Sequence, residues 1–127
     1  RAGKVGEAIR HGVAFLLDRY PLVAASYPTE GSVHPLWFRL NFPLFYQVDI
    51  LFVLRVLAEL GQLDHSHAQL ALEWLANRRK KNGHWRGANP FRQRTWSVLA
   101  DAEETNRWVT LHTVIIMNKA INGKISK

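Results

Sequence analysis

Apolar residues recur at helical spacing in four segments of the chain, at about residues 4–19, 46–60, 66–80 and 107–120. The first and third segments are apolar on one face only, whereas the second and fourth are apolar on nearly every side. A helix with one apolar stripe lies at a surface, and a helix that is apolar all round is enclosed by other helices. The pattern therefore predicts an all-α protein in which amphipathic outer helices alternate with apolar inner helices.

Turn and capping residues mark the ends of these segments. Gly61, Asn82-Gly83 and Asn122-Gly123 are expected to end the last three helices. Asp64 or Ser66 is expected to cap the third helix. The inward stripe predicted for that helix is Ala68, Ala71, Leu72 and Leu75.

Two long connections, at about residues 20–45 and 84–106, are rich in aromatic residues. Connections of this length are either functional or packed into a larger assembly. The order of outer helix, aromatic connection and inner helix occurs twice, at about residues 4–60 and 66–121, which is the pattern of a helical repeat. We interpret residues 1–127 as a single repeat domain of two helical hairpins.

Two hairpins cannot close a ring, so we expect the chain to be a fragment or the C-terminal part of a longer protein. The second and fourth helices are also more apolar than two hairpins can cover. We therefore expect this face to self-associate, to pack on the rest of a parent chain, or to close around an apolar ligand, with Phe52, Val56 and Ile116 in the contact.

One part of the sequence resembles a known repeat. Trp74-Leu75, followed by Gly83 and Trp85, is similar to the QW repeat of squalene and other terpenoid cyclases, with Arg79 where the motif has glutamine. The segments WFRLNFPLFYQVDILFVLRVLAELG and NRWVTLHTVIIMNKA look like the C-terminal part of bacterial prenyltransferase/squalene-oxidase-repeat proteins. The likeness extends from about Phe15 to Ala120. It implies part of an α/α toroid; an α-solenoid or a small helical bundle is the alternative.

The acidic elements that carry chemistry in that superfamily are not found in this sequence. Asp101-Ala-Glu-Glu104 does not have the order of the acidic DxDD element, and we interpret it as a solvated loop. Asp64, His65 and His67 are better explained by helix capping than by zinc. We expect no metal and no cofactor.

Several aromatic and titratable residues could nevertheless line a cavity for a hydrophobic, isoprenoid-like ligand. For Asp49 we favour stabilisation by the dipole of the second helix, and for His112 a place in the core. For the aromatic rings we favour structural packing over the lining of a cavity. The candidates are Trp37, Phe42, Tyr46, Asp49, Trp85, Trp96, Trp108 and His112.

Charge adds a different candidate. The net charge is +7, and seven Lys or Arg residues fall between positions 78 and 94. Such a balance suits polyanionic partners, although a solvated basic surface explains it too. The candidates for contact with a polyanion are Arg78, Arg79, Arg86, Arg92 and Arg94. Nucleic acid is not the partner we expect.

Three functions remain open from the sequence. The first is a toroid-like repeat domain without a recognisable catalytic motif in this stretch. The second is part of an isoprenoid-processing enzyme whose catalytic residues lie outside this chain, so the sequence does not decide whether the protein is an enzyme. The third is a basic helical scaffold that binds a polyanion or a protein. The chain has no cysteine, which leaves the redox compartment undetermined. The opening residues form no signal peptide and no segment suits a bilayer span, so we expect a cytoplasmic protein.

Overall fold

The computed structural model describes residues 2–19, 34–45 and 48–125. Within these ranges the fold is helical, and its extended backbone forms a single bridge, a parallel one between Asn41 and Ala88. The all-α prediction is therefore confirmed. The helices are α1 (Ala2–Arg19), α2 (Ile50–Glu59), α3 (Ser66–Asn77), α4 (Ser97–Ala100) and α5 (Ala102–Ile125), with 3-10 turns η1 (Pro35–Phe38) and η2 (Arg92–Arg94).

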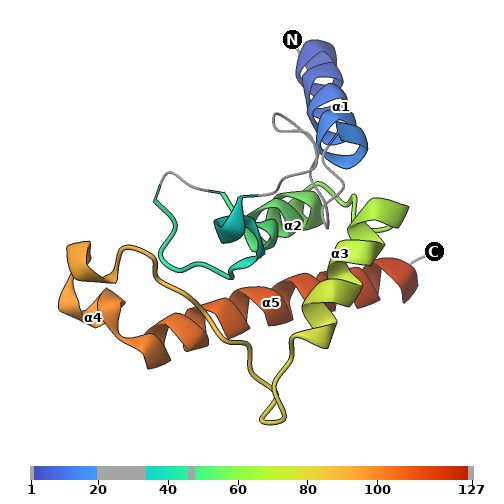
Figure 1. The fold of residues 1–127 in the computed structure, drawn as a ribbon. Coiled ribbons are helices and arrows are strands. Elements are labelled where there is room, and N and C mark those ends of the chain that lie inside the picture. Colours follow the sequence, from blue (N-terminus) through green and yellow to red (C-terminus); the bar gives the residue numbers. More distant parts are fainter. Residues whose placement is uncertain (1, 20–33, 46–47, 126–127) are drawn as a thin grey trace.

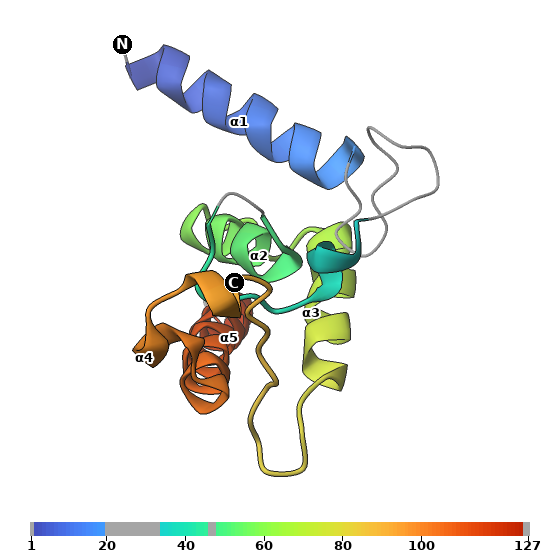
Figure 2. The same ribbon diagram turned by 60° about the vertical axis from the view of Figure 1, so that its left-hand side comes forward.

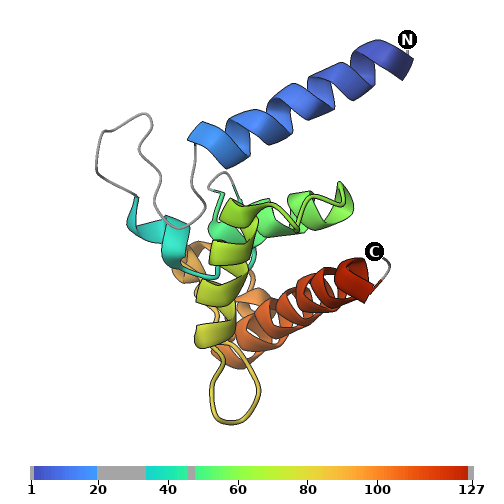
Figure 3. The same cartoon turned by 90° about the vertical axis from the view of Figure 1, so that its right-hand side faces the viewer.

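The helices are arranged around α2, which lies between α1 and α5 in all three views (Figures 1, 2 and 3). Helix α3 packs on α2, and Lys124 of α5 donates a 2.9 Å hydrogen bond to Gln69 of α3. Helix α4 sits at the start of α5, at the opposite end of that helix from the C-terminus (Figure 1). No helix in the described part of the chain combines the length and the apolar content needed to cross a membrane.

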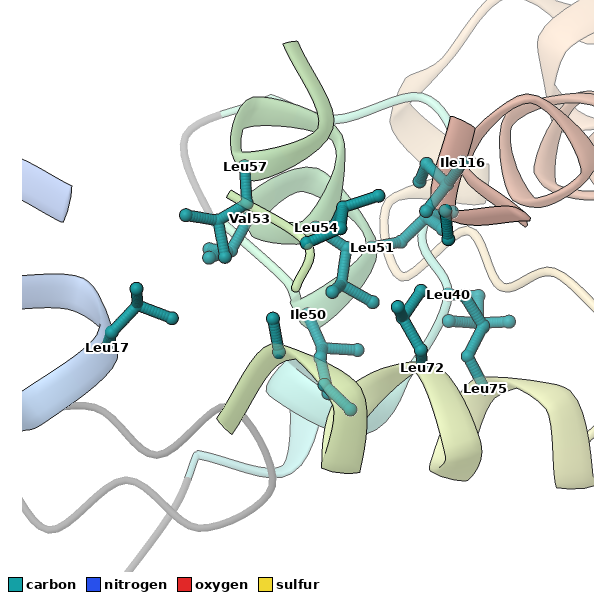
Figure 4. Packing of buried hydrophobic residues seen from close by; sticks show 14 of the residues in the cluster. Leu17, Leu40, Ile50, Leu51, Val53, Leu54, Leu57, Leu72, Leu75 and Ile116 are labelled. Carbon is teal, nitrogen blue, oxygen red and sulfur yellow. The ribbon is translucent and has the colours of Figure 1, made fainter. Parts of the chain in front are cut away.

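The core is built where α2, α3 and α5 meet (Figure 4). Ile50, Leu54 and Leu57 of α2 are fully buried, and Ile116 of α5 is 1% exposed. The predicted stripe of α3 is confirmed, since the buried residues of that helix are Ala68, Ala71, Leu72 and Leu75. Burial of a Leu or Ile side chain stabilises the fold by about 1.5–3 kcal/mol.

The ends of the helices differ from those predicted. Helix α2 begins at Ile50 rather than at residue 46, because Asp49 takes the cap position. Helix α3 ends at Asn77, and Gly83, at φ 85°, belongs to a separate turn in which its N–H donates to the carbonyl of Lys80. The cap of α3 is His65, whose ring nitrogen accepts from the amide of His67, so neither Asp64 nor Ser66 was the right prediction.

Helix α5 is longer than expected and presents a different face to the core. Asp101 accepts from the amides of Glu103 and Glu104 at 2.8 and 2.9 Å, so the acidic run is a helix start rather than a loop. Thr105 and Thr113 are buried at helical spacing with Val109. Each threonine hydroxyl donates a hydrogen bond to the backbone carbonyl four residues earlier in the chain. The hydroxyl group therefore has a hydrogen-bond partner inside the core.

Helix α1 forms as predicted but contributes little to the core. Val13 and Leu17 are buried, whereas Val5 and Ile9, on the same predicted face, are 59% and 43% exposed. A ring nitrogen of His67 makes a hydrogen bond with the carbonyl of Leu17, which ties the end of α1 to α3. The rest of α1 extends away from the other helices (Figure 3).

Candidate anion-binding site

The two long connections that were predicted to be aromatic loops are joined to each other by backbone hydrogen bonds. The amide of Phe42 donates to the carbonyl of Ala88 at 2.9 Å, and the amide of Ala88 donates to the carbonyl of Leu40 at 2.8 Å. Asn41, between these bonds, donates through its side chain to the carbonyls of Leu36 and Arg39. The segment after η1 is thereby fixed against the segment that follows α3.

Trp85 and Gly87 fix the second segment to the helices. The indole N–H of Trp85 donates to the carbonyl of Leu75 at 2.7 Å, and its backbone N–H donates to the hydroxyl of Thr110 at 3.0 Å. Gly87 lies so close to α5 that a Cβ there would be 2.8 Å from the carbonyl oxygen of Thr105. Trp85 therefore has a structural role, because it joins the end of α3 to α5.

These two connections and the end of α3 line an open groove with a volume of about 700 Å³. Four arginines line it: Arg39 follows η1, Arg78 caps the end of α3, Arg86 precedes the bridged segment, and Arg92 opens η2. The guanidinium carbon of Arg78 lies 4.2 Å from the ring centroid of Trp74, a cation–π contact that holds it at the groove. The other lining residues are Phe38, Leu40, Gly87, Ala88 and Asn89.

The four guanidinium groups have no carboxylate partner among the described residues. The ion pairs found there use other residues: Arg107 with Glu103 and Glu104, and Lys119 with Glu59. Residues 74–100 contain no Asp or Glu at all. Among the described residues the groove therefore concentrates positive charge without a carboxylate to balance it, and an anionic ligand would relieve the mutual repulsion.

Two other residues of the groove, Gly87 and Asn89, have polar groups that are engaged within the protein. The amide of Gly87 donates to the side-chain oxygen of Asn106 at 2.7 Å. Asn89 donates to Thr95 and to the carbonyl of Leu99, and its side-chain oxygen accepts from the amide of Phe91. The guanidinium forks are donors available to a ligand, and their geometry matches phosphate, sulfate or carboxylate.

The structure unites part of the predicted basic cluster and separates the rest. Arg78, Arg86 and Arg92 line the groove, whereas Arg79 and Arg94 are not among its lining residues. Arg79 lies next to Arg78 at the helix end but points to the ring of Trp85, 5.7 Å from its centroid. Arg39 was missed, because only the bridge between residues 41 and 88 brings it to the other three.

A second, smaller cavity of about 240 Å³ gathers three of the predicted ligand-cavity residues, namely Phe42, Asp49 and His112, together with Arg55. Burial raises the pKa of Asp49, against the effect of its hydrogen bonds. Burial, and then the charge of Arg55, lowers the pKa of His112. This cavity is smaller than the roughly 300–1,000 Å³ usual for small-molecule sites.

The hydrogen bonds of the Asp49 carboxylate give it a structural role. Its Oδ1 accepts from the amide of Phe52 at 2.9 Å. Its Oδ2 accepts from the backbone and side-chain N–H groups of Asn41 at 2.7 and 3.1 Å. The carboxylate therefore caps α2 and holds the segment after η1 at the same time, in agreement with the predicted role at the helix start.

The remaining aromatic candidates do not form one cavity. Trp108 stacks on Phe42 with ring centroids 5.1 Å apart, at the edge of the smaller cavity. Trp37 packs against the core and Trp85 is buried in it. Trp96 is 82% exposed, so its predicted place in a cavity is wrong. Tyr46 lies outside the described residues.

In the described ranges no group of three or more His, Cys, Asp or Glu side chains could hold a metal ion. The chain matches no protein-family model, and no curated protein and no solved structure matches it.

Proposed function

We propose that this chain is an all-helical binding module that holds a phosphate-rich polyanion in the groove lined by Arg39, Arg78, Arg86 and Arg92. The observation that carries the proposal is that four guanidinium groups line one groove without a carboxylate partner among the described residues. Arginine forks bind phosphate oxygens in pairs, with charge-assisted hydrogen bonds.

Binding, rather than catalysis, suits the residues present. The described lining of the groove contains no carboxylate, histidine, hydroxyl or thiol that could act as a base or a nucleophile. Its guanidinium groups are exposed, so the charge is open to a ligand from solvent.

The test is a titration of fluorescently labelled polyphosphate at several salt concentrations. Arg39→Gln/Arg86→Gln should weaken binding by roughly tenfold or more, because two charge-assisted hydrogen-bonding groups are lost. The dependence of log K on log salt should also become shallower. Arg79→Gln/Arg94→Gln removes the same charge outside the groove and is the matched control.

Equal effects of the two double variants would mean that net charge alone attracts the polyanion, and the groove would lose its assigned role. Failure of the unaltered protein to bind at low salt would end the proposal.

A second candidate function follows from the apolar surface of α5. We propose that α2 and α5 form the inner layer of a toroid-like repeat assembly, in which their outer face packs on a second copy of the chain. Leu111, Val114 and Ile115 are 47%, 41% and 44% exposed, and Phe52 of α2 is 39% exposed. Apolar area of this kind supports association. The oligomeric state of the chain tests it.

A further inference from the structure

Helix α4 and the turn before it expose two large apolar side chains close together. Trp96 is 82% exposed and Val98 is 71% exposed. Phe45, itself 53% exposed, packs edge-to-face on Phe91, with ring centroids 5.4 Å apart. Single exposed apolar residues are ordinary on protein surfaces, but a tryptophan and a valine exposed to this degree two residues apart leave apolar area with no cover.

Basic residues precede these side chains in the sequence. Arg92 and Arg94 are exposed in η2, and Arg94 is two residues before Trp96. The first acidic residue after them is Asp101, whose carboxylate accepts from two amides at the start of α5. Arg92 also lines the arginine groove, so the exposed apolar residues continue from the edge of that basic surface.

We infer that the tip formed by residues 91–98 docks on an anionic lipid bilayer, with Trp96 and Val98 entering the interface and Arg92 and Arg94 at the headgroups. The part assigned to Arg92 rests on the proposed function of the groove. Tryptophan favours the boundary between water and hydrocarbon, and arginine keeps its charge at the headgroups while its stem stays apolar. Anionic lipids attract such basic residues near the surface. Shallow docking requires no helix that spans the bilayer.

Two other occupants fit the tip less well. A protein partner would need to cover about 800 Å² of this chain, whereas α4 is a single short turn at one end of the molecule (Figure 1). A single-stranded nucleic acid could stack a base on Trp96, but stacking gives no use to the aliphatic side chain of Val98. A bilayer uses the tryptophan, the valine and the arginines together.

The experiment is co-sedimentation of the full chain with vesicles of phosphatidylcholine, with or without phosphatidylserine. The unaltered protein should bind the phosphatidylserine vesicles more strongly. Trp96→Ser/Val98→Ser should lower the partition coefficient by about tenfold or more, from the lost apolar burial. Arg94→Gln should lower it by about fivefold, from one surface charge. The matched control is Ile121→Ser/Ile125→Ser, which changes residues that are 57% and 77% exposed on α5.

Equal binding to both kinds of vesicle, or equal binding by the tip variant and the α5 control, would overturn the inference. Loss of single-stranded RNA binding in the tip variant, without vesicle binding by the unaltered protein, would assign the tip to nucleic acid instead. The groove is tested separately: Trp96→Ser/Val98→Ser should still bind polyphosphate. If this variant binds polyphosphate and the unaltered protein does not bind vesicles, the proposed function is supported and this inference is wrong. Vesicle binding through Trp96 without polyphosphate binding would support this inference and overturn the proposed function.

Discussion

Asp49 shows how one residue can serve both a helix and a loop. It is fully buried and accepts three hydrogen bonds, one from the first turn of α2 and two from Asn41. Burial of the charged form is unfavourable, which is why its pKa is raised from the ordinary value of 3.8. The backbone amides of Asn41 and Phe52 need the carboxylate, however, because an unsatisfied buried donor costs about 1–3 kcal/mol.

Asp49→Asn should therefore destabilise the fold by roughly 1–3 kcal/mol at neutral pH, although it removes a buried charge. The amide keeps one acceptor oxygen and turns an NH₂ group toward donors that had an acceptor. Urea denaturation measures the change. Asp101→Asn is the control, because it alters an exposed cap at which asparagine serves as well as aspartate. Equal stability of the two variants would show that the bonds from Asn41 contribute nothing.

The same variant changes the pH dependence of stability. The folded protein holds a proton on Asp49 more tightly than the unfolded chain does, since the folded pKa is the higher one. This contribution to the free energy of unfolding is complete below pH 3.8 and is lost as the pH rises from there through the folded pKa. Asp49→Asn should remove that fall from the pH profile, and a profile unchanged by the substitution would contradict the raised pKa.

At the scale of elements, the segment after α3 is positioned by its close approach to α5. Gly87 has space for no side chain there, since an added Cβ would lie 2.6 Å from Cγ2 and 2.8 Å from the carbonyl oxygen of Thr105. The threonine side chain could rotate, but the carbonyl belongs to the backbone of α5 and cannot move without disturbing the helix. The arginines of the groove on either side of Gly87 depend on this contact for their positions.

Gly87→Ala should destabilise the fold by about 1–3 kcal/mol, the usual cost of overpacking. It should also weaken polyphosphate binding, because Arg86 is displaced with the segment. Gly123→Ala is the control: a Cβ there meets no atom within 4 Å, and alanine should stabilise α5 by about 0.5–1 kcal/mol. Thermal unfolding of both variants measures the difference, and a Gly87→Ala protein as stable as the original would refute the close approach.

At the scale of the whole molecule, α5 has one face in the core and another in solvent. Ile116 is 1% exposed, whereas its neighbour Ile115 is 44% exposed. The expectation that Ile116 lies in an outer contact is therefore wrong. Phe52 does lie at the surface, as expected.

Ile115→Asp should leave the fold intact and shift the protein from dimers or larger species to monomers in sedimentation, if the outer face of α2 and α5 associates as proposed. Ile116→Asp should instead abolish folding, because it places an unpaired charge in the core, at a cost of several kcal/mol. Circular dichroism separates the two outcomes. A monomer before any substitution would rule out self-association through this face.

The hydrophobic pattern by itself determined the helices that have a strong 3.6-residue period. The stripe of α3 was predicted residue by residue, because its burial follows from the spacing of small and aliphatic side chains on one face. The pattern was less informative for α5, whose residues 107–120 carry apolar side chains on nearly every side, so the buried positions of Thr105 and Thr113 could not be read from it. Periodicity identifies a buried face only where the opposite face is polar.

Only the tertiary structure decided where the charges meet. Arg39 and Arg78 are far apart in the sequence, and the bridge between residues 41 and 88 brings them to one groove. Arg78 and Arg79 are neighbours in the sequence, yet they point to different tryptophans. The sequence predicted a basic region, because the charge of a segment can be counted from its residues. The groove is a property of the backbone hydrogen bonds that join two loops, and such long-range pairing leaves no periodic signal in the chain.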